Sequence, residues 1–120
     1  MFLNFLCVGL GGAAGAMLRY AISLIPSRTT FPILTLVTNA LGALLIGIVV
    51  ALSVKYTGIS DKTILLLKTG LCGGFTTFST FSLETFDLFN SRHIGLAVLY
   101  MVLSLGVCLA GVWAGEKVIS

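Results

Sequence analysis

The third of four long apolar stretches in this chain mixes phenylalanine, hydroxyl and glycine residues, GLCGGFTTFSTFSLE at 70–84. Phe78 and Phe81 are three residues apart and are therefore neighbours on one face of a helix. The edge of an aromatic ring carries partial positive charge, so paired ring edges can attract an anion weakly. Phenylalanine is also an ordinary core residue of membrane helices. The spacing alone therefore leaves an ion lining and simple packing both open.

The glycine and threonine run Gly73, Gly74, Thr76 and Thr77 predicts a break in the same helix. Glycine is flexible, and threonine hydroxyls compete for the hydrogen bonds of the backbone. Non-helical backbone inside a membrane is tolerated only where protein or a ligand satisfies its freed N–H and C=O groups. Freed carbonyl groups suit a hard cation such as Na+ or K+. The run is therefore a candidate cation site.

Two other apolar stretches carry groups that can donate hydrogen bonds to an anion. Asn39 has an amide NH2 group that donates, although asparagine also joins membrane helices to one another. Tyr100, Ser104 and Cys108 follow at i, i+4 and i+8, which places a phenol, a hydroxyl and a thiol on one helical face. The alternatives are that Ser104 bonds the carbonyl four residues earlier and that Tyr100 belongs to an interfacial belt.

Among the charged residues within the apolar stretches, Arg19 and Glu84 are candidates for function. Arg19 is compatible with a snorkelling anchor and with a positive vestibule that attracts anions. Glu84 shares a helical face with Thr77 and Phe81 by i, i+4 and i+7 spacing. A carboxylate inside a membrane is a candidate proton carrier or cation ligand, whereas one near the interface can simply accept hydrogen bonds.

The elements that must position these residues are apolar helices. Of 120 residues, 58% are hydrophobic and 9% charged, which is typical of an integral membrane protein. Crossing a bilayer takes about 20 apolar residues in a helix. The predicted spans are 2–24, 33–54, 64–88 and 94–113, forming one four-helix transmembrane domain over 1–120. A run such as LLIGIVVALSV is apolar on every face and excludes a β-barrel pattern. The fold class is therefore an all-α, multi-pass membrane protein.

The seven basic residues are scattered at helix ends, so the net charge of +3 does not indicate a nucleic-acid partner. Short connections make successive helices antiparallel and place both termini on one side. Lys and Arg then divide four against three between the two sides, which gives no clear orientation by the positive-inside rule. We therefore expect an antiparallel dimer of oppositely oriented copies. The three cysteines, Cys7, Cys72 and Cys108, have no metal-type spacing and are expected to be buried as small hydrophobes.

Three motifs together resemble the Fluc (CrcB) family of fluoride channels: GGAAGAMLRY at 11–20, TLVTNALGALLIG at 35–47 and, above all, GLCGGFTTFSTFSLE at 70–84. The resemblance runs over nearly the full chain and implies a multi-pass protein of a bacterial inner membrane. It implies a dual-topology antiparallel homodimer with two narrow pores, which exports fluoride passively from the cytoplasm and relieves fluoride toxicity. Some members pair with a paralogue instead; the balanced Lys and Arg count favours self-pairing.

The resemblance also implies roles for individual residues. Phe78 and Phe81 resemble the phenylalanine box of the fluoride path, Asn39 its pore asparagine, and Tyr100 with Ser104 its fourth-helix polar track. Two further positions match the family's third-helix glutamate and its vestibule arginine, namely Glu84 and Arg19. We add Thr77 to the path because it shares the helical face of Phe81.

The break resembles the family's central Na+ site, where backbone carbonyls of Gly73 and Thr76 from both subunits would hold a structural cation. Two residues depart from the family pattern. Cys108 stands where the track often has a hydroxyl, and Thr38 precedes the asparagine where an apolar residue is expected. Because a thiol is a weak donor, the first departure puts the outer part of the path in doubt.

The main alternative is a small four-helix, dual-topology exporter of cationic drugs that is coupled to protons. Such a protein would share the length, the short loops and the balanced charge. It needs a central carboxylate, which we would expect in the first helix, and that helix has none. Glu84 is the only acid at useful depth. His, Cys and acidic residues do not converge in the sequence, so we do not expect an enzyme.

Overall fold

The computed structural model describes residues 1–120 and contains only helices. Helix α1 covers Phe2–Ser23, α2 covers Ile33–Lys55 and α6 covers Ile94–Ile119. The third span is divided into α3 (Asp61–Ile64), the π-helix η1 (Leu65–Cys72), α4 (Gly73–Phe75) and α5 (Phe78–Asn90). All four spans are long and apolar enough to cross a membrane. The last helix continues to Ile119, beyond the expected end at 113.

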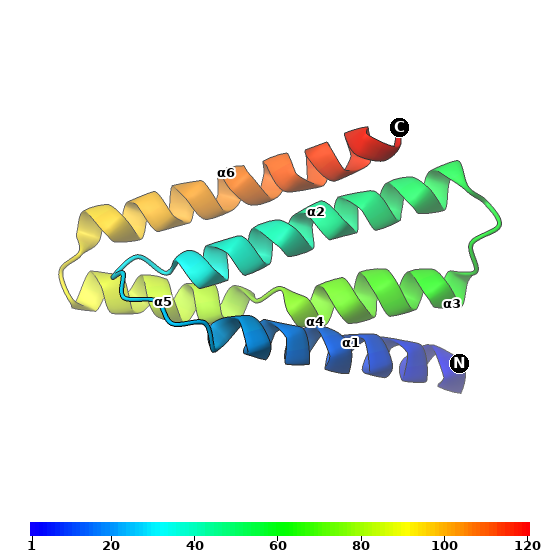
Figure 1. Ribbon diagram of the computed structural model, residues 1–120, viewed down its shortest axis with the longest axis horizontal. Coiled ribbons are helices and arrows are strands. Elements are labelled where there is room, and N and C mark those ends of the chain that lie inside the picture. The colour runs from blue at the N-terminus through cyan, green and yellow to red at the C-terminus, as the bar shows by residue number, and fades with distance from the viewer.

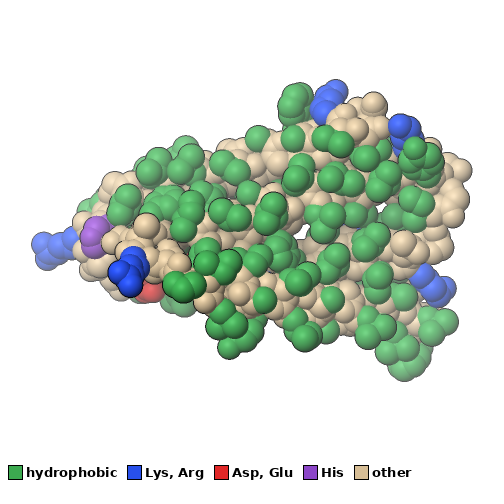
Figure 2. Space-filling model, viewed as in Figure 1, with side chains coloured by type: hydrophobic (Ala, Val, Ile, Leu, Met, Phe, Trp, Pro, Cys, Tyr) green, Lys and Arg blue, Asp and Glu red, His purple; other side chains and the backbone are tan.

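The spans form two closely packed pairs that lie along a common axis (Figure 1). Helix α1 packs on η1 and α4, and α2 packs on α6. Both termini lie at the same end as the connection between α2 and α3, so successive spans are antiparallel as expected. Figure 2 shows Lys and Arg side chains toward the two ends of the long axis, with hydrophobic side chains over the middle of the visible face. This distribution suits a bilayer core between two polar layers.

Glycine residues allow both pairs of helices to approach at backbone distance. A Cβ atom on Gly15 would overlap the Leu71 carbonyl, and one on Gly74 would overlap the backbone of Gly12. In the second pair, a Cβ atom on Gly115 would overlap the Leu44 carbonyl of α2. Such contacts between small residues are a principal source of helix association in membranes, where lipid is as apolar as the side chains. The contact at Gly115 also gives the last turns of α6 a partner.

The break in the third span is shorter than the sequence predicted. Gly73 and Gly74 are helical, and only Thr76 and Thr77 leave the helix, both with extended backbone angles. The reason is that Gly74 serves close packing on α1 and does not loosen the backbone. The hydroxyl of Thr76 donates to the Cys72 carbonyl at 2.9 Å, and the Thr77 hydroxyl accepts from the Thr80 amide at 3.1 Å. The Thr76 hydroxyl thus caps the C-terminal end of α4, and the Thr77 hydroxyl caps the N-terminal end of α5.

The two adjacent glycines should respond differently to the same substitution. Gly74→Ala forces a methyl group into the backbone of Gly12, whereas the nearest atom to a Cβ on Gly73 is the Lys68 carbonyl at 3.9 Å. We expect Gly74→Ala to destabilise the protein by about 1–3 kcal/mol through overpacking. Gly73→Ala should leave stability unchanged or slightly raised, since alanine is the better helix former. Thermal unfolding in detergent measures both, and equal melting temperatures for the two variants would contradict the packing role of Gly74.

Candidate functional site

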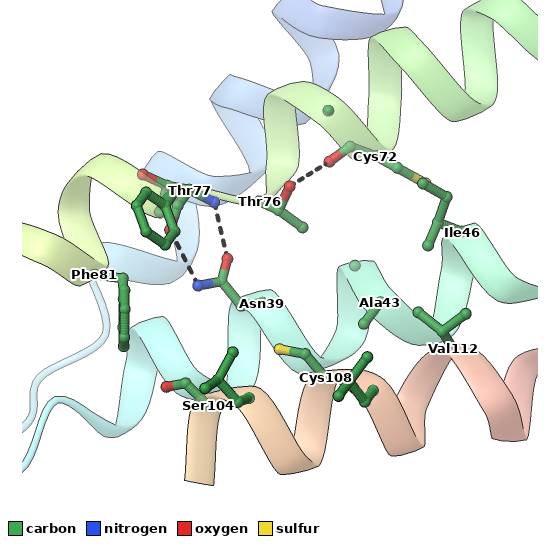
Figure 3. Close-up of a pocket in the computed structure, with 15 residues that line it drawn as sticks. Asn39, Ala43, Ile46, Cys72, Thr76, Thr77, Phe81, Ser104, Cys108 and Val112 are labelled. Atoms are coloured by element: carbon green, nitrogen blue, oxygen red, sulfur yellow. Dashed lines mark hydrogen bonds between the residues drawn. The ribbon is translucent and has the colours of Figure 1, made fainter. Parts of the chain in front are cut away.

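Asn39 of α2 holds the break in the third span through both ends of its amide. Its Nδ2 donates to the Thr77 carbonyl at 3.1 Å, and the Thr77 amide donates to its Oδ1 at 2.8 Å (Figure 3). The pair satisfies two backbone groups that the break removes from the helix. Asn39 therefore joins two helices, which was one of the two readings of its sequence position. Its second Nδ2 hydrogen is not used in these bonds and can still donate.

The Gly73 and Thr76 carbonyls are among the groups at the break that lack their helical partners. In a continuous helix, the Gly73 and Thr76 carbonyls would accept from the amides of Thr77 and Thr80. Those amides donate instead to Asn39 Oδ1 and to Thr77 Oγ1. Gly73 and Thr76 also line a cavity between the break, α2, α5 and α6. Freed carbonyl oxygens are the donor set that a hard monovalent cation needs, so these residues fit the predicted Na+.

A central cavity of about 420 Å³ lies between the break, α2, α5 and α6. Its walls are mostly apolar, and no Lys, Arg, Asp or Glu lines it. The polar and aromatic residues on its walls are Asn39, Thr76, Thr77, Phe78, Phe81, Ser104 and Cys108 (Figure 3). The structure thus brings residues from three spans, far apart in the sequence, to one cavity that contains donors but no fixed charge.

Aromatic rings continue from this cavity toward one end of the bundle. The ring centroids of Phe78 and Phe81 are 5.6 Å apart, and those of Phe81 and Tyr100 are 5.0 Å apart. Phe31, which sequence reasoning did not select, meets Tyr100 edge to face at 5.5 Å. Tyr100 is completely buried, so it does not belong to an interfacial belt. Phe78 is 78% exposed in the single chain.

Glu84 accepts hydrogen bonds at both carboxylate oxygens. The Tyr100 hydroxyl donates to Oε1 at 3.0 Å, and the Thr35 hydroxyl donates to Oε2 at 3.1 Å. Thr35 was missed in the sequence, although it precedes Asn39 by four residues and so shares its face of α2. Glu84 also lines a polar pocket of about 390 Å³ whose other polar members include Ser27, Thr29, Thr30, Asp87 and Ser91. The carboxylate therefore stands between this polar pocket and the buried phenol.

Ser104 follows Tyr100 by one turn of α6 and lies on the same helical face. Its hydroxyl oxygen is buried and has no hydrogen-bond partner. It does not bond the Tyr100 carbonyl, as the alternative interpretation required, whereas Thr38, Thr76 and Thr85 all bond the carbonyl four residues earlier. An unpaired buried hydroxyl is costly and needs an explanation such as a ligand. Glu84 lines the polar pocket and Ser104 lines the central cavity, while the Tyr100 phenol that donates to Glu84 belongs to the helical turn before Ser104.

Arg19 lies on the other side of the break. Its Nε donates to the Gly74 carbonyl at 3.2 Å, and the side chain is half-buried. With Thr35, Thr77 and Thr80 it lines a third hollow, of about 160 Å³. The guanidinium is thus directed at the break, and Thr77 contributes to both this hollow and the central cavity.

The two departures from the family pattern have different surroundings. Thr38 is buried and donates to the Leu34 carbonyl of its own helix at 2.7 Å, so its hydroxyl needs no other partner. Cys108 is half-buried and lines the central cavity. Of the three cysteines, only Cys72 is buried as expected, because Cys7 and Cys108 lie on helix faces that this chain does not cover completely.

Comparison with known proteins gives a consistent result. The family described as CrcB-like protein, Camphor Resistance (CrcB), matches residues 6–116. A "Fluoride-specific ion channel FluC" of Ruminiclostridium cellulolyticum is 44% identical over 117 residues, which is 95% of this chain and 90% of the relative. A protein of the same name from Clostridium perfringens is 45% identical over 115 residues, which is 93% of this chain and 90% of the relative. Another from Agrobacterium fabrum is 40% identical over 116 residues, which is 94% of this chain and 93% of the relative.

The match includes all four apolar spans, and the relatives come from bacteria. The chain is accordingly a multi-pass protein of a bacterial membrane. The resemblance seen in its motifs is confirmed, and the protein belongs to the CrcB family.

Proposed function

We propose that this chain forms a fluoride-selective ion channel that exports fluoride passively from the cytoplasm, and that it is not an enzyme. The proposal is carried by its similarity, over more than nine-tenths of its length, to relatives named "Fluoride-specific ion channel FluC". The geometry supports it independently. The central cavity offers the free hydroxyl of Ser104, the unused N–H of Asn39 and the ring of Phe81 without any fixed positive charge.

The mechanism follows from the chemistry of fluoride. Fluoride is small, strongly hydrated and a strong hydrogen-bond acceptor, so a pore must replace its water with donors. Hydroxyl, amide and ring-edge groups provide these donors at a strength that lets the ion leave again. A buried Lys or Arg would hold the anion, and none lines the cavity. A membrane potential that is negative inside supplies about 2.3 kcal/mol per 100 mV for each exported charge, so no further energy source is needed.

We further propose that two oppositely oriented copies form the channel. The Gly73 and Thr76 carbonyls and the largely exposed Phe78 lie beside the central cavity, at a depth where lipid cannot satisfy backbone groups. A second copy would cover them, and the balanced Lys and Arg count supports opposite insertion. Chemical cross-linking of the protein purified after expression alone should trap a dimer. A protein that remains monomeric in detergent and in liposomes would contradict self-pairing and favour a paralogous partner.

Na+ is the proposed resident cation between the copies. The Gly73 and Thr76 carbonyls would hold it, and its charge would offset their converging dipoles. The protein should then melt at a higher temperature in Na+ than in N-methyl-D-glucamine at equal ionic strength. An identical melting temperature in the two salts would count against a bound Na+.

Growth tests separate the fluoride channel from the alternative proton-coupled exporter of cationic drugs. Expression in a bacterium that lacks its own fluoride export should restore growth in fluoride and should not protect against a cationic dye such as ethidium. Empty vector provides the baseline for both compounds. Protection against ethidium without protection against fluoride would reverse the proposal.

A further inference from the structure

The central cavity contains one accessible thiol. Cys108 is half-buried on α6, one turn beyond Ser104, and Figure 3 shows its sulfur directed toward Asn39. Ser104 lines the same cavity and is 8% exposed, and its buried hydroxyl oxygen has no hydrogen-bond partner. The thiol therefore shares its space with a polar group that lacks a partner and with the amide that holds the break.

The other cysteines differ from Cys108 in access and place. Cys72 is also on the wall of the cavity, but only 1% of its surface is exposed. Cys7 lies on α1 and lines none of the three hollows described above. The reactivity of a thiol toward electrophiles depends on its access. The chain thus supplies two internal comparisons for its cavity thiol.

We propose that Cys108 is a modification site for thiophilic metal compounds, of the organomercurial class, and that its modification closes the ion path. With methylmercury chloride, a bond forms between Sγ and mercury, the S–H proton passes to water and chloride leaves the metal. The reagent is small and neutral, so it can enter the path that fluoride would follow. A cavity of about 420 Å³ has room for a methylmercury group.

The consequence of modification rests on the proposed function. The adduct places apolar bulk between Cys108 and the side chains of Ser104 and Asn39, which are the donors that would replace fluoride's water. A path that depends on single donors cannot conduct around such a group, because an ion that loses hydration without compensation meets a high barrier. Serine in place of Cys108 would provide a stronger donor that does not bind mercury.

The test uses the intact protein in liposomes. Fluoride efflux is recorded before and after micromolar methylmercury chloride, each variant is compared with its own untreated rate, and dimercaprol is then added. Efflux of the parent and of the Cys7→Ser variant should fall at least about tenfold, a barrier increase of about 1.4 kcal/mol, and should return with dimercaprol. Fluoride efflux through the Cys108→Ser variant should be the same after methylmercury chloride as before it.

Peptide mass mapping on the same samples separates the possible failures. A methylmercury group on Cys108 with unchanged efflux would overturn closure of the path. Full inhibition that persists in Cys108→Ser, or the absence of any adduct on Cys108, would rule out Cys108 as the site of modification. An untreated parent that shows no fluoride efflux would contradict the proposed function, while the mapping would still decide whether the thiol is accessible.

Discussion

Replacing Asn39 by alanine is expected to reduce fluoride efflux on the order of 100-fold, the loss typical of removing one preorganised donor. Asn39 lines the central cavity, and the variant loses its amide donor together with both bonds to Thr77. The Thr77 amide and carbonyl would then lack partners at membrane depth, at a cost of roughly 1–3 kcal/mol for each group. Thermal unfolding in detergent should therefore shift downward together with the loss of efflux in liposomes.

The matched control for Asn39→Ala is Thr38→Val on the preceding residue. Thr38 is buried, and its hydroxyl bonds only the Leu34 carbonyl of its own helix. Valine has nearly the same shape, so efflux and melting temperature should stay close to those of the parent. If Asn39→Ala conducted as well as Thr38→Val, Asn39 would be neither a donor to fluoride nor the group that fixes the break.

Replacing Phe81 by isoleucine is expected to slow fluoride efflux about tenfold while the protein stays folded. The ring lies between those of Phe78 and Tyr100 and borders the central cavity. Each aromatic pair that Phe81 loses costs about 0.5–1.5 kcal/mol in stability. Loss of the ring edge from the ion path would raise the barrier to fluoride, and a rise of about 1.4 kcal/mol corresponds to a factor of ten in rate. Efflux from liposomes that contain equal amounts of variant and parent measures the change.

Phe86 on the same helix offers the comparison for Phe81→Ile. It is 60% exposed and lines none of the three hollows. Phe86→Ile should therefore conduct like the parent, and both variants should elute at the same position in size-exclusion chromatography. Equal efflux from the two would assign Phe81 to packing, the alternative that its spacing left open.

The sequence predicted the spans and the presence of a break because these depend on local properties. Apolar length sets the spans, and the hydroxyls of Thr76 and Thr77 compete with the backbone in any context. The prediction that Gly74 loosens the helix was wrong. A missing side chain can serve backbone flexibility or the close approach of two helices, and the sequence does not say which. Only the position of Gly12 on the neighbouring helix distinguishes the two.

The contacts of the polar residues could not be predicted, because they depend on how the helices cross. Nothing in the sequence joins Glu84 to Tyr100 or to Thr35, which belong to different spans. Arg19 left an anchor and a vestibule equally open, and its bond to the Gly74 carbonyl is visible only once α1 lies on α4. The sequence singled out these residues through their polarity at depth, while their partners emerged from packing.

The most direct test of a passive fluoride channel is paired recording of fluoride and chloride loss from the same liposomes. They contain the purified protein and both potassium salts, and valinomycin makes the membrane permeable to K+ so that charge does not limit anion movement. We predict rapid fluoride loss that depends on valinomycin, with chloride loss no faster than from protein-free liposomes. Equal loss of the two halides, or no fluoride loss above the protein-free level, would contradict the account.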